Sequence, residues 1–423
     1  MTEVALTEVA PPFVYTDGQQ RANERFISFI TNPDEHVFIL SGYAGTGKST
    51  LVEKIMRELD STIKLANLIN ETHNSYEVAL TATTNKAAEA LALITGREVR
   101  TIQSFLGLRV STNFKTQRST LQPHKKTVVV EDSIIFIDEA SYIDAHLLGL
   151  IHDWTNNCKI VFIGDPAQLT PIESRTTCVW EQKYPVAHLD EVVRQADGNP
   201  IIDLATSFRD TVGTGEFFSF TPDGVHVDHM SRDKFDAKII EEFSRVGRDH
   251  NDAKVLAWTN KTVIGYNQAI RGVVQGVPEL QVGDYAICNK YISNAKCLVK
   301  TDATVLITKF DPATDHGVTG FKVEMDKRHS AFLPASLEAK KAAIKAAKTE
   351  ENFARLAYIE SNWIDLRAAY ACTINKSQGS TYDIAFIDLD DIKKCNSANQ
   401  IARMLYVAVS RARLHVFLTG DLV

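Results

Sequence analysis

Cysteine pairs, long apolar stretches and excess positive charge are all missing from this sequence, and each lack excludes a class of protein. The six cysteines form no Cys-x-x-Cys pair, so neither a disulfide scaffold nor a structural zinc site is expected. No apolar run approaches the ~20 residues that span a bilayer. The start of the chain carries acids and prolines without a basic segment and a long apolar one, so no signal peptide is expected there. We therefore expect a cytoplasmic protein with no membrane partner.

Acidic residues outnumber basic ones. The 53 Asp and Glu against 46 Lys and Arg give a net charge of −7, which argues against a polybasic partner mode but allows a local basic groove. The 44% hydrophobic and 23% charged residues are ordinary globular usage and exclude a disordered or fibrous chain. At 423 residues the chain is too long for one core, and roughly 100–200 residues per domain predicts two to four domains.

Two sets of short apolar runs predict an α/β fold with two lobes. The runs share β-branched residues, and most are followed by a polar or glycine turn and then a helix-like stretch. This is typical of parallel strands with crossover helices on both faces of the sheet. The first set is 36–40, 77–83, 133–138 and 159–164, and the second is 254–260, 368–373, 383–388 and 415–419.

Two segments interrupt this pattern. Residues 281–333 read as a small antiparallel β module, and helices are expected in the Ala- and Lys-rich stretch 335–363 that follows. Residues 109–128 are polar and basic, and we expect a hairpin there. It could split a duplex with Phe114 or Leu121 as the wedge; the alternative is a solvated loop.

A phosphate-binding loop is the strongest motif. Residues 42–49 fit G-x-x-x-x-G-K-[ST], between an apolar strand and a helical stretch as this motif requires. Backbone N–H groups of such a loop and the following helix N-terminus bind phosphate oxygens. Lys48 would reach the β- and γ-phosphates of a nucleotide, and Ser49 would bind Mg²⁺. The predicted contacts are Gly42, Gly45, Thr46, Gly47, Lys48, Ser49 and Thr50.

Two later strand ends carry polar side chains that fit the same site. Asp138 and Glu139 follow the run 133–138, and carboxyl ends of neighbouring parallel strands meet at one sheet edge. Asp138 would hold Mg²⁺, and Glu139 would orient and deprotonate the attacking water. Gln168, after the run 159–164, suits a sensor of the γ-phosphate or the water. Alone, the acids could be a solvated helix start and Gln168 an exposed turn residue.

These three motifs in this order resemble superfamily 1 helicases, and with the motifs that follow they are most similar to the RecD/Dda branch of superfamily 1B. The resemblance covers about residues 15–275 and 365–420 and is weak over 281–363. It implies two RecA-like lobes, an SH3-like inserted module, and ATP-dependent 5′→3′ movement on single-stranded DNA with unwinding of duplex. It also implies a phage origin and a role in replication or recombination.

The resemblance assigns further site residues. Gln19 would recognise adenine, Gly379 would contact the nucleotide, and Arg194 and Arg411 would approach the γ-phosphate, ahead of Arg413. The predicted DNA contacts are Thr83, Thr84, Asn85, Lys86, Thr101, Gln103, Trp258, Thr259, Asn260, Asn375 and Lys376. Gln103 and Asn375 stand where the family often has His. From the residues alone, helix capping by Thr and Asn, a core role for the Trp and surface ion pairs for the Arg remain open alternatives.

The expected organisation follows from these assignments. The predicted parts are 1–108 with 129–193 (lobe 1A), 109–128 (insertion 1B), 194–280 with 364–423 (lobe 2A) and 281–363 (insertion 2B). ATP and Mg²⁺ are the expected cofactors of a monomer. Single-stranded DNA and single-strand/duplex junctions are the expected partners, together with a single-strand binding protein or replisome components. The alternatives are a P-loop ATPase acting on RNA, a non-unwinding loader or translocase subunit, and a non-catalytic interaction module.

Overall fold

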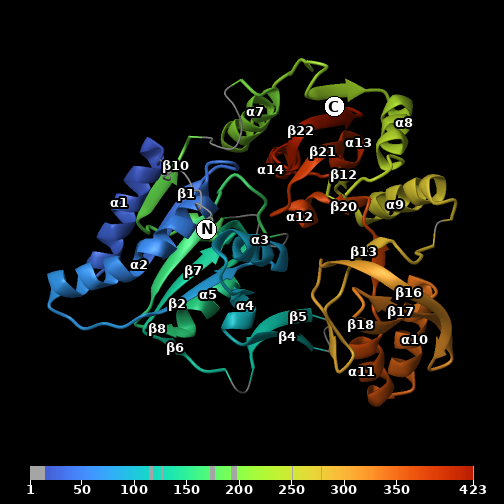
Figure 1. Cartoon of the computed structure of the whole chain (residues 1–423), viewed down its shortest axis with the longest axis horizontal. Coiled ribbons are helices and arrows are strands. Elements are labelled where there is room, and N and C mark those ends of the chain that lie inside the picture. Colours follow the sequence, from blue (N-terminus) through green and yellow to red (C-terminus); the bar gives the residue numbers. More distant parts are fainter. Residues whose placement is uncertain are drawn as a thin grey trace, which may run out of the picture.

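Three bodies make up the part of the chain that the structure describes. The computed structural model describes residues 15–113, 118–124, 127–171, 177–191, 198–249, 251–277 and 279–422. A first lobe lies at the left of Figure 1, a second lobe at the upper right and an inserted β module at the lower right. Within these ranges no helix is long and apolar enough to cross a membrane. Phe114 and Arg194 fall outside the described residues.

The first lobe is built on a parallel sheet, as the first set of apolar runs predicted. In spatial order its strands are β10 (Val186–Leu189), β1 (Val37–Gly42), β9 (Lys159–Gly164), β7 (Ser133–Asp138), β2 (Glu77–Ala82) and β3 (Val99–Thr101). β9 is buried along its whole length, because helices cover this sheet on both faces, and its residues after Lys159 are apolar without alternation. The carboxyl ends of β1, β9 and β7 lie side by side at one edge.

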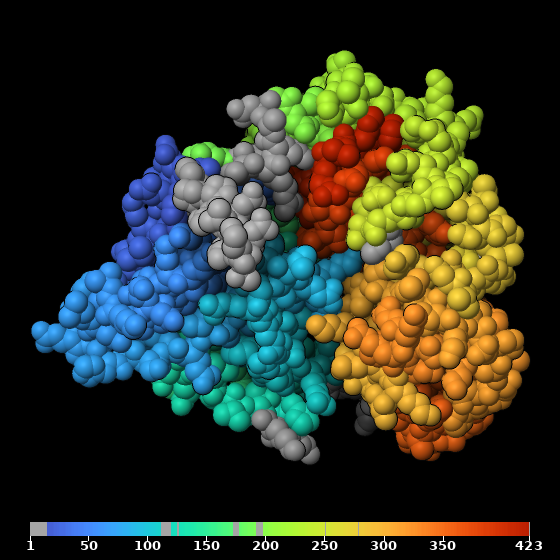
Figure 2. All heavy atoms as spheres, in the orientation of Figure 1, coloured from blue at the N-terminus to red at the C-terminus, as the bar shows by residue number. Residues whose placement is uncertain are grey.

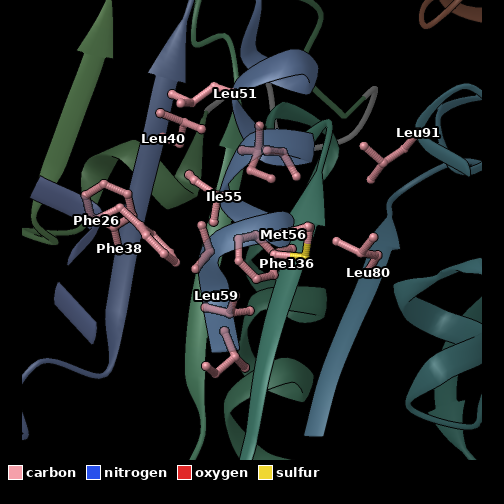
Figure 3. Packing of buried hydrophobic residues seen from close by; sticks show 14 of the residues in the cluster. Phe26, Phe38, Leu40, Leu51, Ile55, Met56, Leu59, Leu80, Leu91 and Phe136 are labelled. Carbon is pink, nitrogen blue, oxygen red and sulfur yellow. The ribbon is translucent and has the colours of Figure 1, made fainter. Parts of the chain in front are cut away.

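Helices cover both faces of this sheet. On one face lie α1 (Asp17–Thr31), α2 (Lys48–Asn70) and α3 (Asn85–Thr95). On the other lie α4 (Ile102–Phe105), α5 (Ala145–Asp153) and α6 (Cys178–Glu181). Figure 3 shows Leu51, Ile55, Met56 and Leu59 of α2 against Phe38, Leu40 and Phe136 of the sheet. Burying each such side chain contributes about 1.5–3 kcal/mol. This packing holds α2, and the loop before it, against β1.

The second lobe repeats the design. Its parallel strands, in spatial order, are β11 (Val227–Met230), β22 (Ala412–Thr419), β21 (Tyr382–Asp388), β12 (Ala253–Ala257) and β20 (Ala371–Thr373). One face packs against α7 (Pro200–Thr214), α12 (Ile374–Ser377), α13 (Leu389–Ile392) and α14 (Ala398–Val409). The other packs against α8 (Arg232–Phe243) and α9 (Asn260–Val274). Ala167 and Leu169, which follow β9 of the first lobe, are buried in this second core and join the two lobes.

An antiparallel sheet occupies the region where a β module was predicted. Its strands, in spatial order, are β18 (His329–Pro334), β17 (Val318–Met325), β16 (Thr304–Asp315), β13 (Tyr285–Cys288) and β19 (Leu366–Ala368). The short pair β14 (Ile292–Asn294) and β15 (Cys297–Val299) packs with it, and α10 (Leu337–Thr349) and α11 (Phe353–Asn362) follow β18. In Figure 2 the orange surface of the module meets both the blue first lobe and the yellow second lobe. The SH3-like designation stays a prediction.

One predicted strand is wrong in its extent. The run 368–373 contributes to two sheets, because β19 pairs with β13 in the module whereas β20 pairs with β12 in the second lobe. Asn267 of α9 fixes the step between them: its Oδ1 accepts hydrogen bonds from the N–H groups of Tyr370 and Ala371, both at 3.0 Å. The chain therefore changes sheets at residues 369–370.

The basic insertion forms the expected hairpin. β4 (Leu108–Asn113) pairs antiparallel with β5 (Arg118–Pro123). Leu121, one of the two proposed wedges, is partly buried against the first lobe, and its carbonyl oxygen lies 2.8 Å from His146 Nε2. Its side chain is thus engaged by the lobe, which weakens its candidacy as a wedge. Beside the hairpin, β6 (Val130–Glu131) pairs with β8 (Thr155–Asn156).

Candidate functional site

A cavity of about 320 Å³ between the two lobes contains most of the residues predicted to bind a nucleotide. The predicted residues that line it are Gln19, Gly45, Gly47, Lys48, Ser49, Thr50, Asp138, Glu139, Gln168, Gly379 and Arg411. Gly379 and Arg411 come from the second lobe and the others from the first. Gly42 and Thr46 belong to the same loop but do not line the cavity.

The backbone of the phosphate loop requires its glycines. Gly47 has φ +77°, in the left-handed region that side chains disfavour, and a Cβ atom at Gly42 would lie only 2.8 Å from Leu189 Cβ. No side chain caps the N-terminus of α2, which begins at Lys48. The first N–H groups of this helix are therefore available to an anion, and the helix dipole favours one there.

Two side chains brace this loop from within the cavity. Lys48 Nζ donates to the carbonyl oxygens of Gly42 at 2.7 Å and Tyr43 at 2.8 Å. Gln19 Nε2 donates to Thr46 O at 3.2 Å, and a capping box between Thr16 and Gln19 holds the start of α1. The ammonium and the Gln19 amide are thus both held against the backbone of the loop.

The acid pair lies at the end of β7, beside the loop. Glu139 adopts φ +54°, and its backbone N–H donates to Asp138 Oδ1 at 2.8 Å. Burial, followed by the neighbouring Glu139 charge, raises the pKa of Asp138 to about 7, although the Glu139 N–H and the Lys48 ammonium oppose this. A carboxylate with this pKa gains from a cation that replaces its proton.

The oxygen donors at this site fit Mg²⁺. The Ser49 hydroxyl and the Asp138 carboxylate line the same cavity, and hard divalent cations of this size prefer oxygen ligands completed by water and phosphate. Among the described residues no group of three or more His, Cys, Asp or Glu side chains could hold a metal ion by itself. A magnesium ion here would therefore depend on the nucleotide for further ligands.

Arg411 supplies a cation to the cavity from the second lobe. Its side chain is 7% exposed, and its guanidinium donates to Val407 O, Ser380 O and Ser410 Oγ at 2.9–3.2 Å. All of these partners belong to the second lobe, so the group is held firmly while it faces the phosphate loop. Arg413 instead pairs with Asp383 on the surface. Arg194 lies outside the described residues.

Three side chains of the second lobe that the sequence did not single out form hydrogen bonds with the first lobe near this cavity. Tyr406 of α14 accepts a hydrogen bond from the Ala44 N–H of the loop at 2.9 Å and donates to Asp165. Arg403, on the same helix, donates to the carbonyl oxygens of Pro166 and Gln168. Gln378 Nε2 donates to Glu139 Oε2 at 3.0 Å and to Gln168 Oε1 at 2.6 Å. The sequence gives the identity of these three residues, but it does not reveal their partners in the other lobe.

A second cavity of about 670 Å³, here called the groove, lies between the lobes and the module. The predicted DNA contacts that line it are Thr84, Lys86, Trp258, Asn260, Asn375 and Lys376. Lys86 Nζ donates to Lys376 O across the lobes at 3.1 Å, and Lys376 Nζ pairs with Asp302 of the module at 2.8 Å. The groove thus has walls from every body of the molecule, with hydroxyl, amide, ammonium and aromatic groups of the kind that bind single strands.

The other predicted DNA contacts lie outside the groove and have local partners. Thr101 caps α4 through Ser104 N–H, and Thr259 caps α9 through Thr262 N–H. Thr83 is buried, with its hydroxyl on Glu139 O at 2.9 Å, and Gln103 Nε2 donates to Thr83 O at 3.4 Å. Asn85 Nδ2 donates to Thr301 O of the module at 3.3 Å. Thr101 and Thr259 therefore serve as helix caps here, which is the alternative that their residue type left open.

Asp391 supports the groove wall without lining it. Its carboxylate accepts hydrogen bonds from the N–H groups of Trp258 at 2.8 Å and Thr259 at 2.7 Å, and from the Thr259 and Thr262 hydroxyls. Burial would raise the pKa of this carboxyl, but the ion pair with Lys394 and these hydrogen bonds outweigh it and lower the pKa. This network fixes the strand end that presents Trp258 and Asn260 to the groove.

Comparisons with known proteins agree with this geometry. A family model described as an AAA domain matches residues 14–226, and one described as a UvrD-like helicase C-terminal domain matches residues 368–419. The chain is 26% identical to the ATP-dependent DNA helicase dda of Enterobacteria phage T4, over 95% of this chain and 98% of that one. It is 25% identical to the ATP-dependent DNA helicase Pif1 of Bdellovibrio bacteriovorus, over 90% and 82%.

A solved structure shares the fold. The Pif1 helicase from Bacteroides, in complex with ADP-AlF3 and ssDNA, superimposes with a TM-score of 0.51 over 97% of this chain and 94% of that one, at 15% identity. At 15% identity this similarity shows a common fold and nothing about residue roles.

Proposed function

Because the chain belongs to the superfamily 1B helicases of the RecD, Pif1 and Dda type, with an AAA domain over residues 14–226, we propose that it couples ATP hydrolysis to 5′→3′ movement along single-stranded DNA. It is an ATP-dependent DNA helicase. One observation carries the proposal: a cavity with a phosphate loop and acid pair from one lobe and an arginine from the other adjoins a groove with walls from both.

At the nucleotide cavity each group has one role. The N–H groups at the start of α2 and the Lys48 ammonium bind the phosphates, and the Gln19 amide lies where it can meet the base. Bound Mg²⁺, held by Ser49 and Asp138, would neutralise charge on the phosphate oxygens. Glu139 accepts the proton of the attacking water. Gln168 orients that water or the γ-phosphate.

Arg411 makes catalysis depend on lobe closure. Phosphoryl transfer spreads negative charge over the transferred group, and a planar cation from across the interface stabilises it. Since Arg411 belongs to the second lobe, hydrolysis requires that the lobes stay together, and product release allows them to separate. Lys86 on one side of the groove and Lys376 on the other would then hold a strand in turn, so that each cycle moves the protein along it.

The finer parts of the proposal rest on the resemblance of the sequence motifs to the RecD/Dda branch and on the phage source of one relative. They are the 5′→3′ direction, a role in phage replication or recombination within the host cytoplasm, and contacts with a single-strand binding protein or replisome components. We also propose the division into lobe 1A (1–108 and 129–193), insertion 1B (109–128), lobe 2A (194–280 and 364–423) and insertion 2B (281–363), and action as a monomer. Residues 364–368 depart from this division, because β19 pairs with β13 of the module.

Unwinding of paired substrates tests direction and activity together. Two duplexes of identical sequence would carry a single-stranded overhang only at the 5′ end or only at the 3′ end, with ATP and Mg²⁺. We expect strand separation from the 5′ overhang alone. Equal activity on both, or a preference for the 3′ overhang, would contradict the direction. ATP turnover stimulated by RNA and not by DNA would instead favour an RNA-dependent ATPase.

A further inference from the structure

Gln378 lies where the groove and the nucleotide cavity adjoin. It follows α12 in the segment 375–379, in which Asn375 and Lys376 line the groove and Gly379 lines the nucleotide cavity. Gln378 itself lines the groove and is 4% exposed. A single side chain of the second lobe is thus within contact of both sites.

The Gln378 amide contacts the two groups proposed to handle the attacking water. Its Nε2 lies 3.0 Å from Glu139 Oε2 and 2.6 Å from Gln168 Oε1, with Ser141 Oγ at 3.4 Å. A carboxylate can only accept hydrogen bonds, so the amide nitrogen must face Glu139. One N–H can therefore orient the Glu139 carboxylate while the other orients Gln168.

The oxygen of the same amide is buried and has no hydrogen-bond partner within the described structure. An unpaired buried acceptor is costly, and native proteins keep few of them. This oxygen is therefore free to accept a hydrogen bond from a donor that enters beside it. Because Gln378 lines the groove, a strand or its bound water is the partner that this position admits.

The first lobe holds the segment around Gln378 at other points as well. Tyr142 Oη donates to Asn375 O, and Lys86 Nζ donates to Lys376 O, both at 3.1 Å. Tyr142 and Lys86 both line the groove. A strand that enters the groove must therefore meet the groups that fix this segment.

We infer that Gln378 is a positioning residue through which an occupied groove sets Glu139 and Gln168 for hydrolysis. A strand against Asn375 and Lys376 supplies a partner to the free Gln378 oxygen and locks its amide, which then holds the Glu139 carboxylate toward the water. This inference rests on the proposed function, since it concerns stimulation of ATP hydrolysis by DNA.

The first test compares Gln378→Met with wild type by ATP turnover with and without a single-stranded oligo(dT). Met keeps the length of the side chain and removes both N–H donors. We expect the ratio of turnover with oligo(dT) to turnover without it to fall at least tenfold, with the change in kcat rather than in the KM for ATP. Gln268→Met, an exposed glutamine on α9, is the matched control and keeps the wild-type ratio. An unchanged ratio in Gln378→Met would refute the inference.

A second variant keeps the inference testable if Gln378→Met does not fold. In Gln378→Asn the amide is kept but the side chain is one methylene shorter, so its N–H groups no longer reach both Glu139 and Gln168. We expect the same loss of oligo(dT) stimulation in kcat, with the affinity for oligo(dT) in anisotropy titrations unchanged. Wild-type oligo(dT) stimulation in Gln378→Asn would overturn the proposal.

The proposed function and the role of Gln378 can be refuted separately. If wild-type protein neither responds to oligo(dT) nor separates duplexes, the proposed function is wrong. If wild-type protein does both and the Gln378 variants respond to oligo(dT) as wild type does, only the role of Gln378 is wrong.

Discussion

The phenol oxygen of Tyr406 joins the phosphate loop to Asp165, two segments of the first lobe, from a helix of the second lobe. It accepts a hydrogen bond from Ala44 N–H at 2.9 Å and donates to the Asp165 carboxylate, which is fully buried. Burial, followed by the Asp165 charge, raises the pKa of Tyr406 well above its usual value, so the hydroxyl keeps its proton.

Removing this hydroxyl should loosen the lobe interface. In Tyr406→Phe the ring still packs, but Asp165 keeps only the Ala167 N–H among the hydrogen bonds described for its side chain. Leaving a buried acceptor short of a donor costs about 1–3 kcal/mol. We expect the free energy of unfolding in urea to fall by about that amount, and ATP turnover to fall with it. Tyr291→Phe, at an exposed tyrosine of the module, should change neither. Equal stability of the two variants would contradict this account.

Loss of the loop lysine should abolish hydrolysis. Lys48→Ala removes the ammonium that the loop carbonyls hold next to the phosphate site. We expect DNA-stimulated ATP turnover to fall by about 100-fold or more. Circular dichroism should be unchanged, since the side chain packs against no core cluster. Lys64→Ala, at an exposed lysine on the same helix, is the matched control. Near wild-type turnover in Lys48→Ala would remove the nucleotide-site assignment.

Asp391→Asn should weaken binding of single-stranded DNA, although Asp391 does not line the groove. An amide cannot pair with Lys394, and it presents only one oxygen to the N–H groups of Trp258 and Thr259. We expect stability to fall by about 1–3 kcal/mol, and binding of a fluorescent oligo(dT) to weaken several-fold in anisotropy titrations. Asp233→Asn, at an exposed position on α8, serves as the control. Unaltered oligo(dT) affinity would show that the network is not needed for the groove.

Lys159 should give the protein a distinctive alkaline stability profile. Its Nζ donates to the carbonyl oxygens of Phe29, Asn32 and Glu35 at 2.8–3.0 Å, near the end of α1, and burial lowers its pKa to about 8. In the unfolded chain the pKa is about 10.4, so between these values the unfolded state binds more protons and stability rises with pH.

The measurement compares wild type with Lys159→Met by urea unfolding at pH 7.5, 8.5 and 9.5. Each pKa unit corresponds to about 1.4 kcal/mol, so the wild type should gain on the order of 1–2 kcal/mol relative to the variant across this window. Lys64→Met should follow the wild type. A constant difference between wild type and Lys159→Met at all three pH values would contradict the prediction.

The central strands and the phosphate loop could be predicted because their signals are local. A strand covered on both faces has a continuous apolar run, as β9 has after Lys159, and the loop residues are contiguous. Edge strands lack this continuous apolar run. β10 alternates between exposed and buried residues, so the sequence pattern did not predict it as a strand. The division of the run 368–373 depends on Asn267, about 100 residues away in the chain, and no local pattern contains it.

In the candidate site, too, only the residues with a local sequence signal could be predicted. Asp138 and Glu139 follow a strand whose position next to the loop is fixed by sheet topology, so they were predictable. Gln378 donates a hydrogen bond to Glu139, which lies 239 residues earlier in the chain, and Asp391 accepts one from Thr259, which lies 132 residues earlier. A single sequence gives the residue types at these positions, but only the folded chain gives their partners.

The bond between Asn85 and Thr301 carries a mechanical consequence. The inserted module is covalently part of the second lobe, yet this contact attaches it to the first. Any swing of one lobe against the other must either drag the module along or break that attachment, and a single 3.3 Å hydrogen bond offers little resistance. Separation of the lobes would therefore free the module from the first lobe while it stays joined to the second.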